Sequence, residues 1–144
     1  MKKWLFLCVV GVLGSCGKKV EMADVPKMNG YWEIQKVVLP DGSEKDYKIN
    51  PVFDYFEIKD GRGIRKKVMP QFNGKYLVND LSEAVKVVAK GQKIYLAYTT
   101  PYAKWQEELV SLTDSTMVVA NEEEKEYHYK KTAALDLTHV QKTP

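Results

Sequence analysis

The sequence predicts an all-β domain, in which about eight antiparallel strands follow an up-and-down order and close into a small barrel. Turn dipeptides such as Asp60-Gly61 and Asn73-Gly74 recur about every eight to twelve residues, and the segments between them are rich in Val, Ile, Tyr, Phe and Trp. No interval holds the helix that parallel strands need, so each strand is expected to pair with its neighbours in sequence. Closure is expected because it leaves the sheet without exposed edges.

Alternating polarity justifies the individual strands, because one face of each is expected to point inward. In the first strand, Trp32 and Ile34 share a face. The segment 81–90 is ambiguous, since Ser82 could cap a short helix, whereas three β-branched valines favour a strand. The side chains that are expected to point inward, and that could line a pocket, are Phe56, Ile94, Leu96, Tyr98, Trp105, Leu109, Tyr127 and Tyr129.

Length and charge exclude several classes of protein. The 144 residues are enough for one domain. The 22 basic and 19 acidic residues are interspersed and give a formal charge of +3. A nucleic-acid-binding protein needs a clustered basic face, so we expect no nucleic-acid partner. The hydrophobic content of 44% is ordinary and argues against a disordered or polytopic membrane protein.

The first residues have the pattern of an export signal. Lys2 and Lys3 precede a ten-residue apolar stretch, 4–13, which is too short for a permanent span of ~30 Å of hydrocarbon. The stretch ends in Leu13-Gly14-Ser15-Cys16, which resembles the bacterial lipobox. This resemblance implies cleavage after Ser15 and a diacylglycerol on the Cys16 thiol, which would anchor the protein to a membrane.

The alternative is a signal peptide that is cut elsewhere, with Cys16 left as a free or disulfide-bonded thiol. Cys8 is the only other cysteine and would be removed with the signal, so Cys16 would have no partner within the mature chain. No Asp follows Cys16 directly, and no acidic run follows it. We therefore expect an outer-membrane anchor facing the periplasm, with display on the cell surface as the alternative.

The chain divides into four predicted parts. Residues 1–15 are the signal peptide, and 16–28 are the lipidated cysteine and a tether, because this segment has several charges, one Pro and no sustained period. A short helix in the tether is an alternative. Residues 29–132 are the barrel, and 133–144 are a tail that either docks on the barrel or frays. We expect a monomer.

The start of the first strand carries a family motif. Gly30-Tyr31-Trp32 matches the G-x-W pattern, and residues 29–132 behind a lipobox resemble the lipocalin-like domains of small bacterial lipoproteins. The resemblance implies that Trp32 packs across the closed end of the barrel, beneath a basic residue of the last strand, either Lys130 or Lys131. Gly30, Trp32 and these lysines would be structural. The resemblance also implies a small lipophilic ligand.

No group of residues predicts catalysis, so we expect no enzyme, no cofactor and no metal. His128 and His139 lack further ligands at metal-binding spacing. Glu107 and Glu108 are adjacent and point to opposite faces of a strand, so they cannot act as paired carboxylates. Glu107 faces inward if its strand is regular. We expect it at a rim or bulge rather than in an interior ion pair, for which Lys66 is a conceivable partner, or as a ligand anchor.

Two functions of different class follow. The first is a membrane-tethered module that binds a small lipophilic ligand in an open cavity. The second is an envelope interaction module with a filled barrel, which docks a protein or polysaccharide through exposed aromatic residues at its loop tips. Filling is expected over a roomy cavity, because side chains alone can pack the interior of an eight-stranded barrel.

Overall fold

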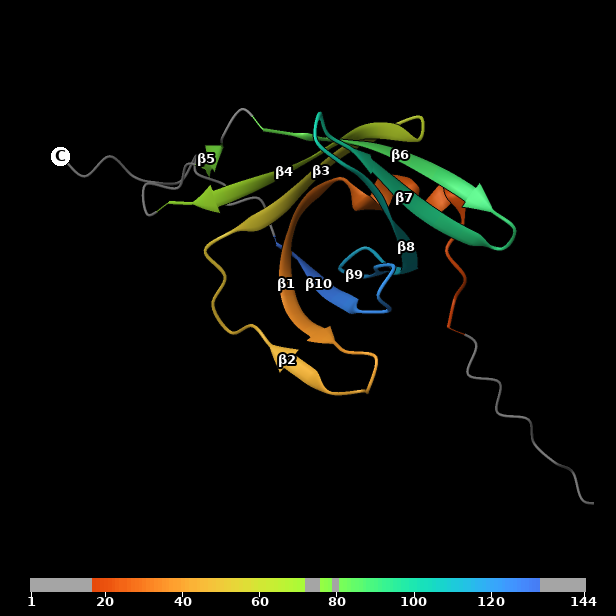
Figure 1. Cartoon of the computed structure of the whole chain (residues 1–144). Coiled ribbons are helices and arrows are strands. Elements are labelled where there is room, and N and C mark those ends of the chain that lie inside the picture. The colour runs from red at the N-terminus through yellow and green to blue at the C-terminus, as the bar shows by residue number, and fades with distance from the viewer. Residues whose placement is uncertain (1–16, 72–75, 79–80, 133–144) are drawn as a thin grey trace, which may run out of the picture.

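A computed structural model describes residues 17–71, 76–78 and 81–132 (Figure 1). A 3₁₀ helix, η1 (Met22–Met28), precedes the strands. The strands of the described residues are β1 (Gly30–Val38), β2 (Glu44–Asp46), β3 (Phe53–Lys59), β4 (Arg62–Pro70), β5 (Tyr76–Val78), β6 (Glu83–Lys90), β7 (Lys93–Thr99), β8 (Lys104–Leu112), β9 (Thr116–Ala120) and β10 (Glu126–Thr132).

Eight of these strands form a closed antiparallel barrel in the order β1-β3-β4-β6-β7-β8-β9-β10. The last strand returns to the first, and the pairing of β1 with β10 runs from Tyr31 opposite Thr132 to Val38 opposite Glu126. The short strands β2 and β5 pair only with β1 and β4. The predicted fold class, an up-and-down barrel of about eight strands, is therefore confirmed.

The ambiguous segment 81–90 is mostly strand, because β6 begins at Glu83 and pairs with β4 and β7. Its valines alternate as a strand requires, with Val85 and Val87 buried inside the barrel. The predicted Asn73-Gly74 turn lies outside the described residues, as do Cys16, the segment 1–15 and the tail 133–144.

Helix η1 covers one end of the barrel, which we call the closed end. Val20, Val25 and Met28 are buried and belong to the same core cluster as Trp32. Val25 and Met28 are three residues apart, and a 3₁₀ helix places such residues on one side. The short helix given as the alternative for 16–28 is therefore found, as η1, and from Val20 onward the chain is part of the packed domain rather than a tether.

The two ends of the barrel follow from the strand order. The β3–β4, β6–β7 and β8–β9 turns lie at the closed end with η1, and the remaining connections lie at the opposite, open end. Figure 1 shows η1 and the β6–β7 turn on one side of the molecule, with the end of β4 on the other. No helix among the described residues is long and apolar enough to cross a membrane.

Candidate functional site

At the closed end, Trp32 joins η1 to the barrel. Its side chain is fully buried, and its Nε1 donates a hydrogen bond to the Met28 carbonyl oxygen at 2.7 Å. The Lys131 Nζ lies 5.1 Å from the centre of the Trp32 ring and donates to the Lys27 carbonyl oxygen at 2.8 Å. Lys130 is exposed, so of the two lysines considered Lys131 is the one over the indole.

Gly30 is needed where the chain enters β1. Its φ is +122°, a conformation that other residues rarely adopt, and a Cβ atom there would lie 3.1 Å from the Lys131 side chain. The G-x-W motif therefore serves the packing of the closed end.

The inward side chains predicted as pocket lining mostly fill the barrel. Phe56, Ile94, Leu96, Tyr98 and Leu109 are buried in one apolar cluster. The remaining three are partly buried and pack against that cluster; they are Trp105, Tyr127 and Tyr129. Most of the predicted lining is thus core.

A network of charged side chains lies inside the open end. Arg65 of β4 is buried, and its guanidinium forms ion pairs with Glu83 of β6 and, at 3.2 Å, with Glu107 of β8. The same guanidinium lies over the Tyr98 ring of β7, 4.1 Å from its centre. Tyr98 in turn stacks on Trp105 with ring centres 5.3 Å apart. Four strands therefore contribute to one polar layer above the apolar core.

Glu107 is an interior residue, not a rim or bulge residue as predicted. It is 7% exposed, and its partner is Arg65 rather than Lys66. Arg65 is paired across the hairpin with Phe56, which points inward, so Arg65 points inward as well. Sequence reasoning missed Arg65 because the apolar residues of β4, Ile64 and Val68, lie on its outward face.

A second ion pair lies beside this network. The Asp54 carboxylate of β3 is buried and pairs with the Lys67 ammonium of β4. The Lys67 side chain is 53% exposed, so it extends from the interior toward solvent. A partly hydrated ammonium of this kind can exchange its intramolecular partner for a ligand at modest cost.

Burial alters the titration of the inner groups. It raises the pKa of Glu107, and the attraction of Arg65 only partly offsets this effect. Burial likewise raises the pKa of Tyr98 and of Tyr129 well above the ordinary value, so both hydroxyls stay protonated at neutral pH. The Tyr98 hydroxyl lies near Glu107 but makes no hydrogen bond of standard geometry with any described residue.

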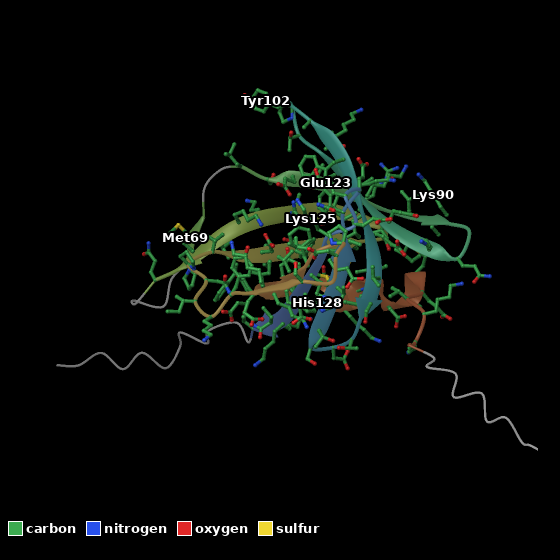
Figure 2. All side chains as sticks on the ribbon, turned by 60° about the horizontal axis from the view of Figure 1, so that its bottom comes forward. Met69, Lys90, Tyr102, Glu123, Lys125 and His128 are labelled. Carbon is green, nitrogen blue, oxygen red and sulfur yellow. The ribbon has the colours of Figure 1, made fainter. Side chains whose placement is uncertain are left out.

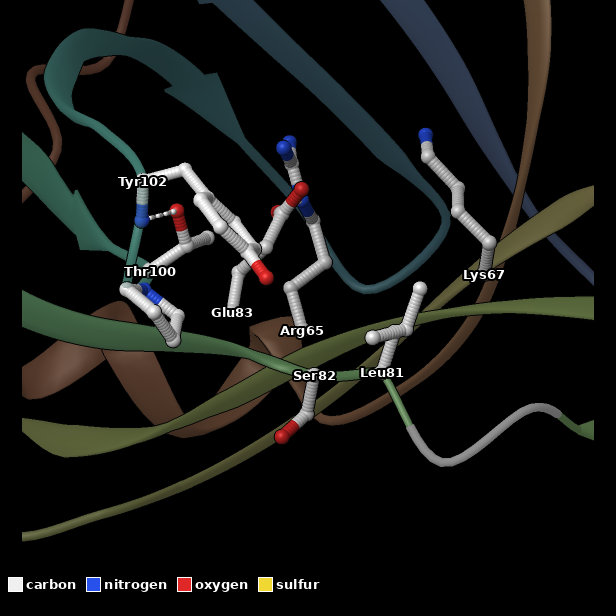
Figure 3. A pocket seen from close by; sticks show the side chains of 8 residues that line it. Arg65, Lys67, Leu81, Ser82, Glu83, Thr100 and Tyr102 are labelled. Carbon is white, nitrogen blue, oxygen red and sulfur yellow. Dashed lines mark hydrogen bonds and ion pairs between the residues drawn. The ribbon is translucent and has the colours of Figure 1, made fainter.

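A hollow of about 380 Å³ opens above the network (Figure 3). Figure 3 shows the ring of Tyr102 extending from the β7–β8 turn toward Arg65 and Glu83. A hydrogen bond from the Tyr102 amide to the Thr100 Oγ1, at 3.2 Å, helps to fix this turn. The residues that line the hollow are Arg65, Lys67, Leu81, Ser82, Glu83, Thr100, Pro101 and Tyr102.

Lys67 also lines a second hollow of about 280 Å³, whose walls include Asp54, Tyr127 and Tyr129. The Lys67 side chain therefore contributes to both hollows. Volumes of this size suit a small molecule or part of one. The predicted lining residues Tyr127 and Tyr129 do reach open space here, whereas the first hollow uses residues that the sequence did not single out.

The rim of the open end carries apolar side chains. Large hydrophobic residues that are exposed on its loops and strand ends are Leu39, Ile49, Met69, Leu81 and Tyr102. Leu81 and Tyr102 belong to both the rim and the larger hollow. The larger hollow thus has apolar side chains at its rim and charged side chains at its base, an arrangement that is suited to an amphipathic molecule.

Two further kinds of site were considered, a metal site and a site at a histidine. The described residues contain no group of three or more His, Cys, Asp or Glu side chains that could hold a metal ion. The His128 Nε2 lies 3.1 Å from the Glu126 Oε2, and neither side chain lines the larger hollow. His139 lies outside the described residues.

Two solved structures that are similar to this chain come from Bacteroides species. Among solved structures, a lipocalin-like protein from Bacteroides uniformis is 14% identical with a TM-score of 0.47, over 74% of this chain and 99% of that protein. An uncharacterized protein from Bacteroides eggerthii is 15% identical with a TM-score of 0.46, over 73% of this chain and 99% of that protein. No curated protein matches the chain.

A family model described as a lipocalin-like domain matches residues 28–119, which is more than half of the chain. The match begins at the end of η1, includes Gly30 and Trp32, and continues through most of β9. Together with the closed eight-stranded barrel, it shows that the chain belongs to the lipocalin-like domain family.

Proposed function

We propose that the protein is a non-enzymatic, lipid-anchored binding protein of the cell envelope, which binds a small lipophilic ligand with a polar group at the open end of its barrel. The family supports a small-ligand-binding module. The proposed anchor is Cys16, and the proposed location is the periplasmic face of the outer membrane. The proposed molecule is a monomer.

The observation that carries the binding role is the larger hollow, where an apolar rim stands over buried charges. Leu81, Pro101 and Tyr102 would contact the apolar part of the ligand, while Arg65 and Lys67 would meet its polar group. Buried ion pairs add little stability beyond that of an apolar core of the same shape. Their presence beneath a hollow therefore favours recognition over stabilisation as their role.

Native mass spectrometry and lipid extraction of the protein purified from its own host test the binding role. A small amphipathic molecule that co-purifies in stoichiometric amount is the expected result. An empty, folded monomer that also fails to bind the amphipathic dye 1-anilinonaphthalene-8-sulfonate would contradict it.

The dye also locates the site. Leu81→Ala with Tyr102→Ala should weaken dye binding about tenfold or more, because both side chains are exposed and their loss removes the apolar walls without disturbing the core. Val110→Ala is the matched control, since Val110 is an exposed apolar residue that lines neither hollow. Equal losses in both variants would place the dye elsewhere.

The anchor has its own test. Cells that produce the full chain should incorporate labelled palmitate into the protein, and Cys16→Ala should abolish both the label and membrane partitioning. Unchanged labelling and partitioning in Cys16→Ala would refute lipidation at this residue.

A second function, docking of a protein or polysaccharide, is supported by one specific observation. Tyr102 is 94% exposed at a loop tip of the open end, and side chains fill the barrel toward its closed end. Crosslinking in the host from a photoreactive residue at position 102 would capture such a partner. Under the ligand-binding proposal, no macromolecule is captured reproducibly.

A further inference from the structure

Charged residues are divided unevenly between the two ends of the barrel. The closed end has nine basic and four acidic residues, a net charge of +5, in the segments 17–29, 59–62, 90–93, 113–115 and 130–132.

The open end has the opposite sign. It has five basic and nine acidic residues, a net charge of −4, in the segments 38–54, 67–71, 81–83, 99–104 and 121–126. The domain therefore has an electrostatic axis that runs along the barrel. Figure 2 shows Lys90 on the side of η1 and Met69 on the opposite side.

The positive charge of the closed end is available to a partner. Seven of its basic side chains are exposed: Lys18, Lys19, Lys59, Arg62, Lys90, Lys93 and Lys130. Lys93 reaches Glu108 at 3.3 Å, while the other six make no ion pair within the described residues. The same end exposes Met22, which lies beside Gly61 of the β3–β4 turn. Cations around an exposed apolar side chain suit the interface of an anionic bilayer.

The proposed lipid on Cys16 would lie close to this same end. Val20 is already buried in the domain, and Cys16 precedes it by four residues. Four residues span at most about 14 Å when fully extended. A lipid on Cys16 would therefore hold the closed end, and not the open end, next to the headgroups.

From these observations we infer that the closed end docks on the surface of an anionic phospholipid bilayer, with the open end facing away from that membrane. The anchored geometry rests on the proposed lipidation of Cys16, whereas the charged docking face does not. Attraction between the basic face and the lipid surface acts over about one Debye length, and the acidic open end is repelled. The hollow at the open end then faces the aqueous side.

Vesicle binding without the anchor tests the docking face. The chain from Gly17 to Pro144 contains every described residue, and far-UV circular dichroism checks that it folds before vesicles are added. At low salt it should partition onto phosphatidylcholine vesicles that contain phosphatidylglycerol, and not onto vesicles of phosphatidylcholine alone. High salt should release it.

Two triple variants with the same change in net charge identify the face. Lys59→Glu, Arg62→Glu and Lys90→Glu together should weaken partitioning about tenfold or more, since each removes a cation from the docking face.

The matched control is Lys45→Glu, Lys48→Glu and Lys104→Glu, three exposed lysines of the open end. This control should retain most of the binding, and far-UV circular dichroism checks that both variants fold. Equal losses in the two variants, or a parent chain that does not prefer anionic vesicles, would overturn the inference. Because no lipid anchor is present, failure here is distinct from failure of palmitate labelling at Cys16.

Discussion

Arg65 connects residues of four strands through a single side chain. Arg65 belongs to β4. Its guanidinium pairs with Glu83 of β6 and Glu107 of β8 and lies over the Tyr98 ring of β7. Burial opposes the charge on the arginine, but the surrounding Tyr98, Glu83 and Asp54 groups raise its pKa above the usual value, so it stays charged. The acids around it therefore decide how the cluster responds to pH.

Glu107→Gln should stabilise the protein at neutral pH. Because burial raises the pKa of Glu107 above its ordinary value of 4.5, the folded protein binds more protons than the unfolded chain as the pH rises above 4.5. The free energy of unfolding of the parent protein therefore falls through that window, and Gln removes the fall. Urea unfolding at a series of pH values should show the advantage of Glu107→Gln growing with pH.

Glu108→Gln is the matched control for this prediction. Glu108 is the adjacent residue on the other face of β8, and it pairs with Lys93 near solvent. Its substitution leaves Glu107 and its Arg65 partner in place, so the fall that Glu107 causes should remain. A constant difference between Glu107→Gln and the parent over the whole pH range would contradict the raised pKa.

Trp32→Ala should lower the free energy of unfolding by about 3 to 5 kcal/mol, because it removes a fully buried indole and leaves a cavity between η1 and the barrel. Chemical denaturation measures the change. Tyr102→Ala, at an exposed aromatic residue, should cost about 0.5 kcal/mol or less. A loss of under about 1 kcal/mol for Trp32→Ala would show that the indole does not bear on the packing of the closed end.

At the scale of elements, the sequence predicted the strands better than their faces. In β7 the apolar residues alternate, and its inward face was identified correctly. In β4 the inward face holds Gly63, Arg65 and Lys67, so polarity indicated the wrong face. Counting pairs outward from the Asp60-Gly61 turn would have placed Arg65 opposite Phe56, so turn register contained the missing information.

Helix η1 was missed as a core element for a different reason. A 3₁₀ helix of seven residues is too short to show a sustained apolar period, and its charged residues looked like those of a tether. Only the packing of Val25 and Met28 beneath Trp32 reveals its role. Information of this kind is tertiary and does not appear in local sequence patterns.

Met28→Ala should lower the free energy of unfolding by about 2 to 5 kcal/mol, since Met28 is fully buried. Met22→Ala in the same helix is the control and should cost about 0.5 kcal/mol or less, because Met22 is largely exposed. Thermal or urea unfolding of the two variants gives the comparison. Equal, small losses would mean that η1 behaves as a tether.

At the scale of the whole molecule, the number of barrel strands, their order and their closure could be predicted, because short connections leave few alternatives to an up-and-down barrel. The candidate site could not. Its larger hollow is built from strand ends and turns that are brought together only by closure, such as Glu83 of β6 and Thr100 after β7. The filling of the barrel by side chains toward its closed end was expected from the size of the domain alone.

The pairing of Tyr31 with Thr132 brings the first and last strands of the barrel to the same place. The domain should therefore tolerate circular permutation, in which a short linker joins Thr132 to Gly17 and new termini open at Tyr102 in the exposed β7–β8 turn. Circular dichroism and an unfolding midpoint close to those of the parent would show that the permuted chain folds. Its amino terminus would then leave from the opposite end of the barrel, so a lipid attached there would turn the larger hollow toward the membrane.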